Sequence, residues 1–162
     1  MTRYIVTLFG VGNLRPAPGT WGSLAAIPLA WLLHLSGGFW LLFAATLVVG
    51  AVGWWATGVE TAGKDDHDPS EIVIDEVVGQ WIALWPVSFG AMFADVDILQ
   101  LWPGFVTAFI AFRVFDIFKP GPVGWADRIK GPSGVMLDDI IAGWMAALVV
   151  SVLAAIAHLA LI

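Results

Sequence analysis

Long apolar segments, separated by short polar or glycine-rich connections, make up most of this chain. They cover residues 21–35, 39–57, 71–94, 98–118 and 135–162. A membrane-spanning helix needs roughly 20 predominantly apolar residues, so every segment after the first is long enough to cross a bilayer. The first is shorter and contains Pro28, which predicts either a short tilted helix or a re-entrant one that stops partway. We therefore expect an all-α membrane bundle of about five spans.

The composition also indicates an integral membrane protein. Hydrophobic residues make up 59% of the 162 residues and charged residues only 12%, with a mean hydropathy of +0.87, which is far from the makeup of a soluble domain. This length leaves no room for a second bundle, so we expect residues 1–162 to form a single membrane-embedded domain. The net charge of −6 suggests no nucleic-acid partner. Cysteine is absent, which excludes disulfides, thiolate metal ligands and a cysteine nucleophile.

The positions of the basic residues predict the orientation of the chain. When about five spans are threaded through a bilayer, all seven Lys and Arg residues fall on one side. They are Arg3, Arg15, Lys64, Arg113, Lys119, Arg128 and Lys130. By the positive-inside rule that side, which includes the N-terminus, is cytoplasmic.

Charged residues also lie inside or at the ends of the apolar segments, where each costs at least ~3 kcal/mol at membrane depth. They are Asp75, Glu76, Arg113, Asp116, Asp138 and Asp139. In the predicted threading the third and fifth spans begin, and the fourth ends, on the cytoplasmic side. These residues therefore fall at one level, and we predict that they form one active site at the cytoplasmic face.

Two pairs of adjacent carboxylates, Asp75-Glu76 and Asp138-Asp139, suit a hard divalent cation. Neighbouring residues on a helix point about 100° apart, so one member of a pair can face a metal while the other faces a neighbour. Mg²⁺ is usually held by a few carboxylates, with water and substrate phosphate completing its shell. Acids near helix N-termini also complement the helix dipole, but that explains one acid more readily than two pairs. We predict that these four residues bind one or two Mg²⁺ ions.

Arg113, Asp116 and Lys119 follow one another at intervals of three residues and so share a helix face. Alone they are typical of an interfacial ion pair with a lysine that reaches the headgroups. Beside two acid pairs, the guanidinium and ammonium groups are suited to hold the oxygens of a phosphate. Asp116 could orient Arg113, bind metal or act as a general base. As catalytic residues we expect Asp75, Asp116, Asp139 and Arg113.

Further substrate-binding candidates lie in the connections on the same side. Residues 12–23 form a Gly/Pro-rich approach to a helix start, where backbone N–H groups, Thr20 and Ser23 could receive a phosphate; the alternative is an ordinary turn with Thr20 as N-cap. Asp127, Arg128 and Lys130 are either substrate-binding residues or a solvated surface that attracts anionic headgroups. With Arg113 and Lys119 they complete the predicted substrate-binding set.

The loop before the third span allows two interpretations. Asp68, Pro69 and Glu71 have the spacing of a capping box, with Pro69 at the first helical position. His67 could bind metal or move protons, although a single loop histidine is more often a solvated side chain.

Four motifs occur in order along the chain. They are PGTWGS at 18–23, DPSEIVIDEVVG at 68–79, FRVFDIFKP at 112–120 and MLDD at 136–139. From about Gly10 to Gly143 this series closely resembles the phosphatidylglycerophosphatase A family. One local departure is GPSG at 131–134, where the family has a more glycine-rich turn.

The resemblance implies a Mg²⁺-dependent phosphatase of the bacterial inner membrane. Such an enzyme hydrolyses phosphatidylglycerophosphate, a phospholipid of the inner leaflet, to phosphatidylglycerol and inorganic phosphate. We expect direct attack by water rather than an aspartyl-phosphate intermediate, because a carboxylate committed to metal is a poor nucleophile.

The alternative class is a small ion- or proton-coupled transporter, which would also keep charges within the membrane. A transporter is expected to have repeated halves and a site near the bilayer midplane. The sequence shows neither feature, and it does not predict the oligomeric state.

Overall fold

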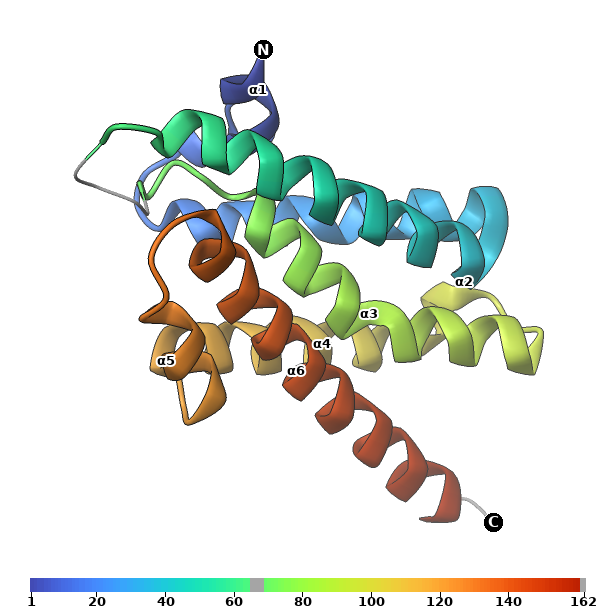
Figure 1. Ribbon diagram of the computed structural model, residues 1–162. Helices are drawn as coiled ribbons and strands as arrows, with labels where there is room; N and C mark the ends of the chain where they lie inside the picture. The colour runs from blue at the N-terminus through green and yellow to red at the C-terminus, as the bar shows by residue number, and fades with distance from the viewer. Residues whose placement is uncertain (65–68, 161–162) are drawn as a thin grey trace.

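The computed structural model describes residues 1–64 and 69–160, and these residues form helices and connections without a strand. Figure 1 shows their arrangement. The α-helices are α1 (Thr2–Val6), α2 (Pro18–Thr61), α3 (Ile74–Ala94), α4 (Trp102–Phe118), α5 (Pro122–Asp127) and α6 (Pro132–Ala160), with 3-10 turns at Val11–Asn13 and Ile98–Leu101. Four of the described helical segments are long and apolar enough to cross a membrane, when the two halves of α2 are taken together as one segment. The all-helical prediction is therefore confirmed, whereas the number of spans and their orientation stay predictions.

Helix α2 consists of two arms that meet at Gly37 and Gly38. Gly38 has φ 64° and ψ −158°, a conformation outside the helical region that favours glycine. The chain reverses direction at this turn (Figure 1). The two arms correspond to the first two predicted spans, but α2 extends from Pro18 to Thr61 and so includes residues before and after them.

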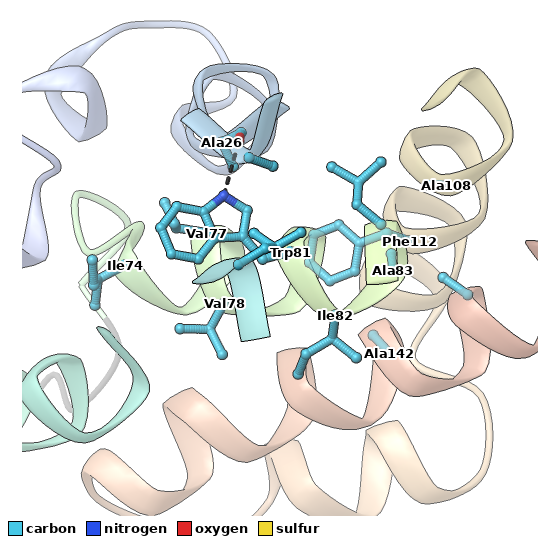
Figure 2. Packing of buried hydrophobic residues seen from close by; sticks show 14 of the residues in the cluster. Ala26, Ile74, Val77, Val78, Trp81, Ile82, Ala83, Ala108, Phe112 and Ala142 are labelled. Atoms are coloured by element: carbon cyan, nitrogen blue, oxygen red, sulfur yellow. Dashed lines mark hydrogen bonds between the residues drawn. The ribbon is translucent and has the colours of Figure 1, made fainter. Parts of the chain in front are cut away.

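Helix α3 is the central helix of the bundle. In its most apolar window 61% of the residues are buried, against 11% to 28% for the other long helices. Figure 2 shows the packing around it: the Trp81 indole N–H donates a hydrogen bond to the Ala26 carbonyl of α2 at 2.8 Å, and Phe112 of α4 lies against the same helix. Because α3 contacts α2, α4 and α6, its first turn can meet side chains from all of them.

The start of α3 differs from the prediction. The helix begins at Ile74, with Val73 at its N-cap, so Pro69 is not at the first helical position and the predicted capping box is wrong. The Val73 N–H instead donates to the Val6 carbonyl at 2.8 Å, which ties the approach to α3 to α1. As a result Asp75 and Glu76 lie in the first turn of α3, where the free N–H groups favour negative charge. His67 and Asp68 lie outside the described residues.

Helices α3 and α6 cross in close backbone contact. A Cβ added to Gly143 would overlap the Gly79 carbonyl oxygen and lie 3.0 Å from the Gly79 Cα. A Cβ added to Gly79 would lie 2.6 Å from the Asp139 carbonyl oxygen. Small residues allow membrane helices to approach this closely. Both acid pairs lie about one turn before this crossing point, so the crossing brings them together.

The remaining elements complete the end of the bundle that carries the charges. Helix α5 lies within residues 119–134, the connection between the last two predicted spans, and α6 begins at Pro132, slightly before the last predicted span. Both ends of α2, the start of α3, the end of α4 and the start of α6 gather at the left of Figure 1. From Ser151 to Leu159 every residue of α6 is exposed, so this part of the helix projects from the bundle.

Candidate active site

The charged side chains predicted to gather do lie together in the structure. They line a cavity of about 170 Å³ at the end of the bundle where α3 and α6 begin and α4 ends. Its walls are Pro18, Gly19, Ser70, Ile72, Asp75, Glu76, Arg113, Asp116, Lys119, Asp138 and Asp139. Four helices and the loop before α3 therefore contribute to one polar cavity.

Two overlapping groups of carboxylates in this cavity have the geometry of cation sites. Asp75, Glu76 and Asp139 each offer an oxygen within 4.8 Å of the other two, and so do Asp116, Asp138 and Asp139. Asp75, Asp138 and Asp139 are buried despite their charge. Carboxylate oxygens are the ligands that Mg²⁺ prefers. The four predicted ligands thus lie together, Asp116 joins them, and Asp139 belongs to both groups.

Unpartnered polar atoms support the fit of a ligand to this cavity. Glu76 Oε2 and Arg113 Nε are buried and have no hydrogen-bond partner among the described residues. Buried polar groups in native proteins are nearly always paired, so such atoms indicate a missing partner. An acidic oxygen suits a cation, and a guanidinium N–H suits a phosphate oxygen.

Arg113 is held by contacts on α4 and α2. Its Nη1 lies 2.7 Å from Asp116 Oδ2 and donates to Ser23 Oγ at 3.3 Å. The Ser23 hydroxyl in turn donates to the Gly19 carbonyl at 2.9 Å. Ser23 is fully buried and supports Arg113 from α2; its predicted contact with substrate stays a prediction.

The N-terminal end of α2 provides space for Glu76. A Cβ at Gly19 would overlap Glu76 Oε1 and lie 3.3 Å from Arg113 Nη1, so a larger residue here would displace the Glu76 carboxylate. Thr20 is absent from the cavity walls, and the N-cap of α2 is Ala17. The alternative interpretation, that Thr20 caps the helix, is therefore wrong, and the role of Thr20 in substrate binding stays a prediction. We had not included Gly19 among the site residues, although its place in the PGTWGS motif was a signal.

Lys119 at the end of α4 connects the cavity to the α5–α6 region. Its ammonium donates hydrogen bonds to Asp127 and, at 2.9 Å, to Asp138 Oδ2. Burial alone would lower the pKa of Lys119, but the two carboxylates outweigh burial and raise that pKa above its ordinary value. Lys119 therefore stays positively charged at any physiological pH.

Asp127, Arg128 and Lys130 lie outside the first cavity. They line a second cavity of about 580 Å³, together with residues at the start of α6. Asp138 lines both cavities. Of the predicted substrate-binding residues, Arg113 and Lys119 are thus in the acidic cavity and these three are next to it.

Ser70 is a further residue that the sequence did not single out. It lines the acidic cavity and accepts a hydrogen bond from Arg15 Nη1 at 3.0 Å. Arg15 belongs to the Gly/Pro-rich residues 12–23 and Ser70 to the polar connection before α3, and only the fold shows that these two connections meet.

The sequence matches known proteins along most of its length. A family model described as phosphatidylglycerophosphatase A matches residues 4–154. Phosphatidylglycerophosphatase A of Escherichia coli (strain K12) is 34% identical over 141 residues, which cover 86% of this chain and 75% of that protein. The Haemophilus influenzae protein of the same name is 36% identical over 143 residues, which cover 88% and 82%.

A protein of Bacteroides thetaiotaomicron named as a putative phosphatidylinositol-3-phosphatase is 39% identical over 145 residues, which cover 86% of this chain and 84% of that protein. No solved structure matches this chain.

Proposed function

Because this chain belongs to the phosphatidylglycerophosphatase A family and is therefore a phosphatase, we propose that it hydrolyses the terminal phosphomonoester of phosphatidylglycerophosphate. The products are phosphatidylglycerol and inorganic phosphate. The observation that carries this proposal is the acidic cavity, in which carboxylates suited to a cation lie beside Arg113 and Lys119.

The carboxylates of α3 and α6 are the proposed ligands of Mg²⁺. Asp75 and Glu76 with Asp139 would hold one ion, and Asp138 and Asp139 with Asp116 provide the donors for a second. Bound Mg²⁺ would polarise the phosphoryl group and lower the pKa of an attacking water.

Arg113 and Lys119 are the proposed phosphate-binding residues. Their positive charges would stabilise the negative charge on the phosphoryl oxygens, which is greatest in the transition state. Asp116 fixes the direction of Arg113 through their 2.7 Å ion pair, and Ser23 supports the same guanidinium from α2. Both are positioning residues for Arg113, and Asp116 also lines the cavity that contains the proposed catalytic carboxylates Asp75 and Asp139.

The reaction is hydrolysis by direct attack of water. A new P–O bond forms from water to phosphorus, and the bond from phosphorus to the glycerol oxygen breaks. The proton lost by water is balanced by the proton that the leaving glycerol oxygen gains. Carboxylates committed to a cation are poor nucleophiles, which favours water; trapping a phosphorylated aspartate would contradict this step.

The proposed setting is the inner membrane of a bacterium, with the chain crossing it several times as one domain. The substrate would lie in the cytoplasmic leaflet, with its phosphomonoester in the acidic cavity and its acyl chains in the lipid. The exposed apolar faces of the long helices are compatible with such surroundings.

The test is phosphate release from phosphatidylglycerophosphate by the purified full chain in neutral detergent. We expect activity with Mg²⁺, loss of activity with excess chelator, and recovery when Mg²⁺ is restored. Phosphatidylinositol 3-phosphate should be assayed in parallel because of the name of the Bacteroides relative. Hydrolysis of that lipid without hydrolysis of phosphatidylglycerophosphate would contradict the proposed substrate.

Asp139→Asn and Asp95→Asn form a matched pair of variants. Asp139 belongs to both carboxylate groups, so its loss should weaken Mg²⁺ binding by more than the roughly 100-fold typical of an outer partner. Asp95 is exposed at the opposite end of α3, in a left-handed conformation that asparagine also adopts. Full activity of Asp139→Asn, or equal losses in the two variants, would remove the proposed metal site.

A further inference from the structure

The cavity next to the acidic site is rich in unpaired positive charge. It is lined by Asp127, Arg128, Ile129, Lys130, Gly134, Val135 and Asp138. Among the described residues, neither Arg128 nor Lys130 forms an ion pair with a carboxylate. The two acids that line the same cavity are both bound by Lys119. The groups left free to bind a ligand are therefore cationic, which suits an anion.

Lys119 and its two carboxylate partners lie between this cavity and the acidic one. The ammonium and Asp138 line the acidic cavity, whereas Asp127 and Asp138 line the cationic one. A molecule whose phosphate is held by Arg113 and Lys119 therefore lies at the border of the cavity that Arg128 and Lys130 line. The cavity lined by Arg128 and Lys130 has a volume of about 580 Å³, which leaves space for a polar headgroup.

The proposed substrate carries an anion in the corresponding place. In phosphatidylglycerophosphate a glycerol unit separates the terminal phosphomonoester from an internal phosphodiester, which joins the headgroup to the diacylglycerol. Phosphatidic acid has a phosphomonoester but no phosphodiester. Arg and Lys are the side chains that bind phosphate oxygens most strongly, through charge-assisted hydrogen bonds.

Building on the proposed function, we propose that Arg128 and Lys130 bind the internal phosphodiester of the lipid and thereby select lipids that carry a second phosphate. These two residues are specificity determinants and do not touch the reacting phosphorus. Loss of either should raise KM for phosphatidylglycerophosphate and leave kcat nearly unchanged.

The experiment uses inhibition of phosphatidylglycerophosphate hydrolysis by ligands that fit only one of the two cavities. Phosphatidylglycerol retains the phosphodiester but lacks the phosphomonoester, whereas phosphatidic acid has the reverse. In Arg128→Gln and Lys130→Gln, we expect inhibition by phosphatidylglycerol to weaken about tenfold, the size of one charge-assisted hydrogen bond. Inhibition by phosphatidic acid and by inorganic phosphate should not change. The assay uses micelles of neutral detergent, so that bulk anionic lipid is absent.

The matched control is Lys64→Gln, which removes an exposed cation in the connection after α2, and Lys64 lines neither cavity. It should leave all three inhibition constants unchanged. The inference would be overturned if inhibition by phosphatidic acid weakened in the two variants as much as inhibition by phosphatidylglycerol, or if only inhibition by inorganic phosphate weakened. An unchanged inhibition constant for phosphatidylglycerol would also overturn it. Absence of phosphate release from phosphatidylglycerophosphate by the unaltered chain would instead contradict the proposed function.

Discussion

Gly19 leaves open the space that the end of the Glu76 side chain occupies. Any larger side chain at this place would occupy the space of Glu76 Oε1. That oxygen is the end of a flexible side chain, so Glu76 can move away with little effect on folding. The carboxylate would, however, leave the group that it forms with Asp75 and Asp139.

Gly19→Ala should therefore affect activity far more than stability. We expect phosphate release to fall by about 100-fold, as is typical when a group at a reacting centre is displaced by about 1 Å. The free energy of unfolding, measured by thermal unfolding in detergent, should change by less than about 1 kcal/mol. Phosphate release and unfolding measured on the same preparation check both parts.

Gly50→Ala is the corresponding control in the other arm of α2. Its Cβ would lie 3.9 Å from the nearest atom of Val78, an ordinary contact, so activity should be retained. If Gly19→Ala were fully active, or if both variants lost activity alike, Gly19 would have no special role in placing Glu76.

For single residues, the sequence predicted which charged side chains gather at the site, but not most of the contacts between them. The spacing of Arg113 and Asp116 predicted their contact, because both lie on one helix. The burial of Ser23 beneath Arg113 and the membership of Asp139 in two groups depend on how neighbouring helices are rotated. That rotation is decided by tertiary packing, which one sequence does not reveal.

Among the helices, the crossing of α3 and α6 at Gly79 and Gly143 matters most for the site. A methyl group at Gly143 would meet backbone atoms of α3, and backbone cannot move aside as a side-chain end can. Separation of the two helices would also separate Asp75 and Glu76 from Asp138 and Asp139.

Gly143→Ala should consequently reduce both stability and activity. We expect a loss of about 1–3 kcal/mol in the free energy of unfolding, the usual size for overpacking in a well-packed contact. Activity should fall with it, because the carboxylate groups of the cavity would separate. Thermal unfolding and phosphate release, again on one preparation, are the measurements.

Gly90→Ala on α3 is the matched control, since its Cβ would lie 3.8 Å from Leu101 Cδ1. Its stability should stay within about 1 kcal/mol of the unaltered chain. An equally stable Gly143→Ala variant would show that the two helices can separate without cost, contrary to this account of the crossing.

For the elements, hydropathy was a good predictor of helices and a weaker predictor of their ends. The apolar segment 98–118 corresponds to the helical segment Ile98–Phe118. The third helix was predicted too early, because Ile72 and Val73 continue the apolar pattern although the Val73 N–H pairs with α1. Helix α5 was missed, since six residues that begin with proline give too short a pattern to recognise.

For the molecule as a whole, all the long helices present one end to the same site. The structure brings the charged ends together, as the alternating direction of the predicted spans required. The C-terminal end of α2 and the turn Ile98–Leu101 lie at opposite ends of the bundle (Figure 1). The orientation of the bundle in a membrane is a prediction from the basic residues alone.

Because the chain has no cysteine, single introduced cysteines can test this orientation without background. Ala62→Cys at the end of α2 should react with a membrane-impermeant thiol reagent only in inside-out vesicles. Gln100→Cys, in the turn before α4, should react only in right-side-out vesicles. Both native residues are exposed, so neither change should disturb packing.

Reaction of both cysteines from the same side would rule out the proposed arrangement of spans, and the reverse pattern would place the acidic cavity at the outer face. As a control, each cysteine variant should restore growth to a strain that lacks the phosphatase. Complementation would show that the labelled molecules are folded.

The contact that Lys119 makes with Asp127 and Asp138 has one more consequence. A lysine ammonium has one more N–H bond than these two carboxylates use, so a spare donor remains for an arriving lipid. The lipid can be received while the α5–α6 region stays tethered, and it need not displace an internal partner first. An arginine would not be equivalent, because the N–H bonds of its rigid guanidinium all lie in one plane, whereas those of the ammonium point in three directions.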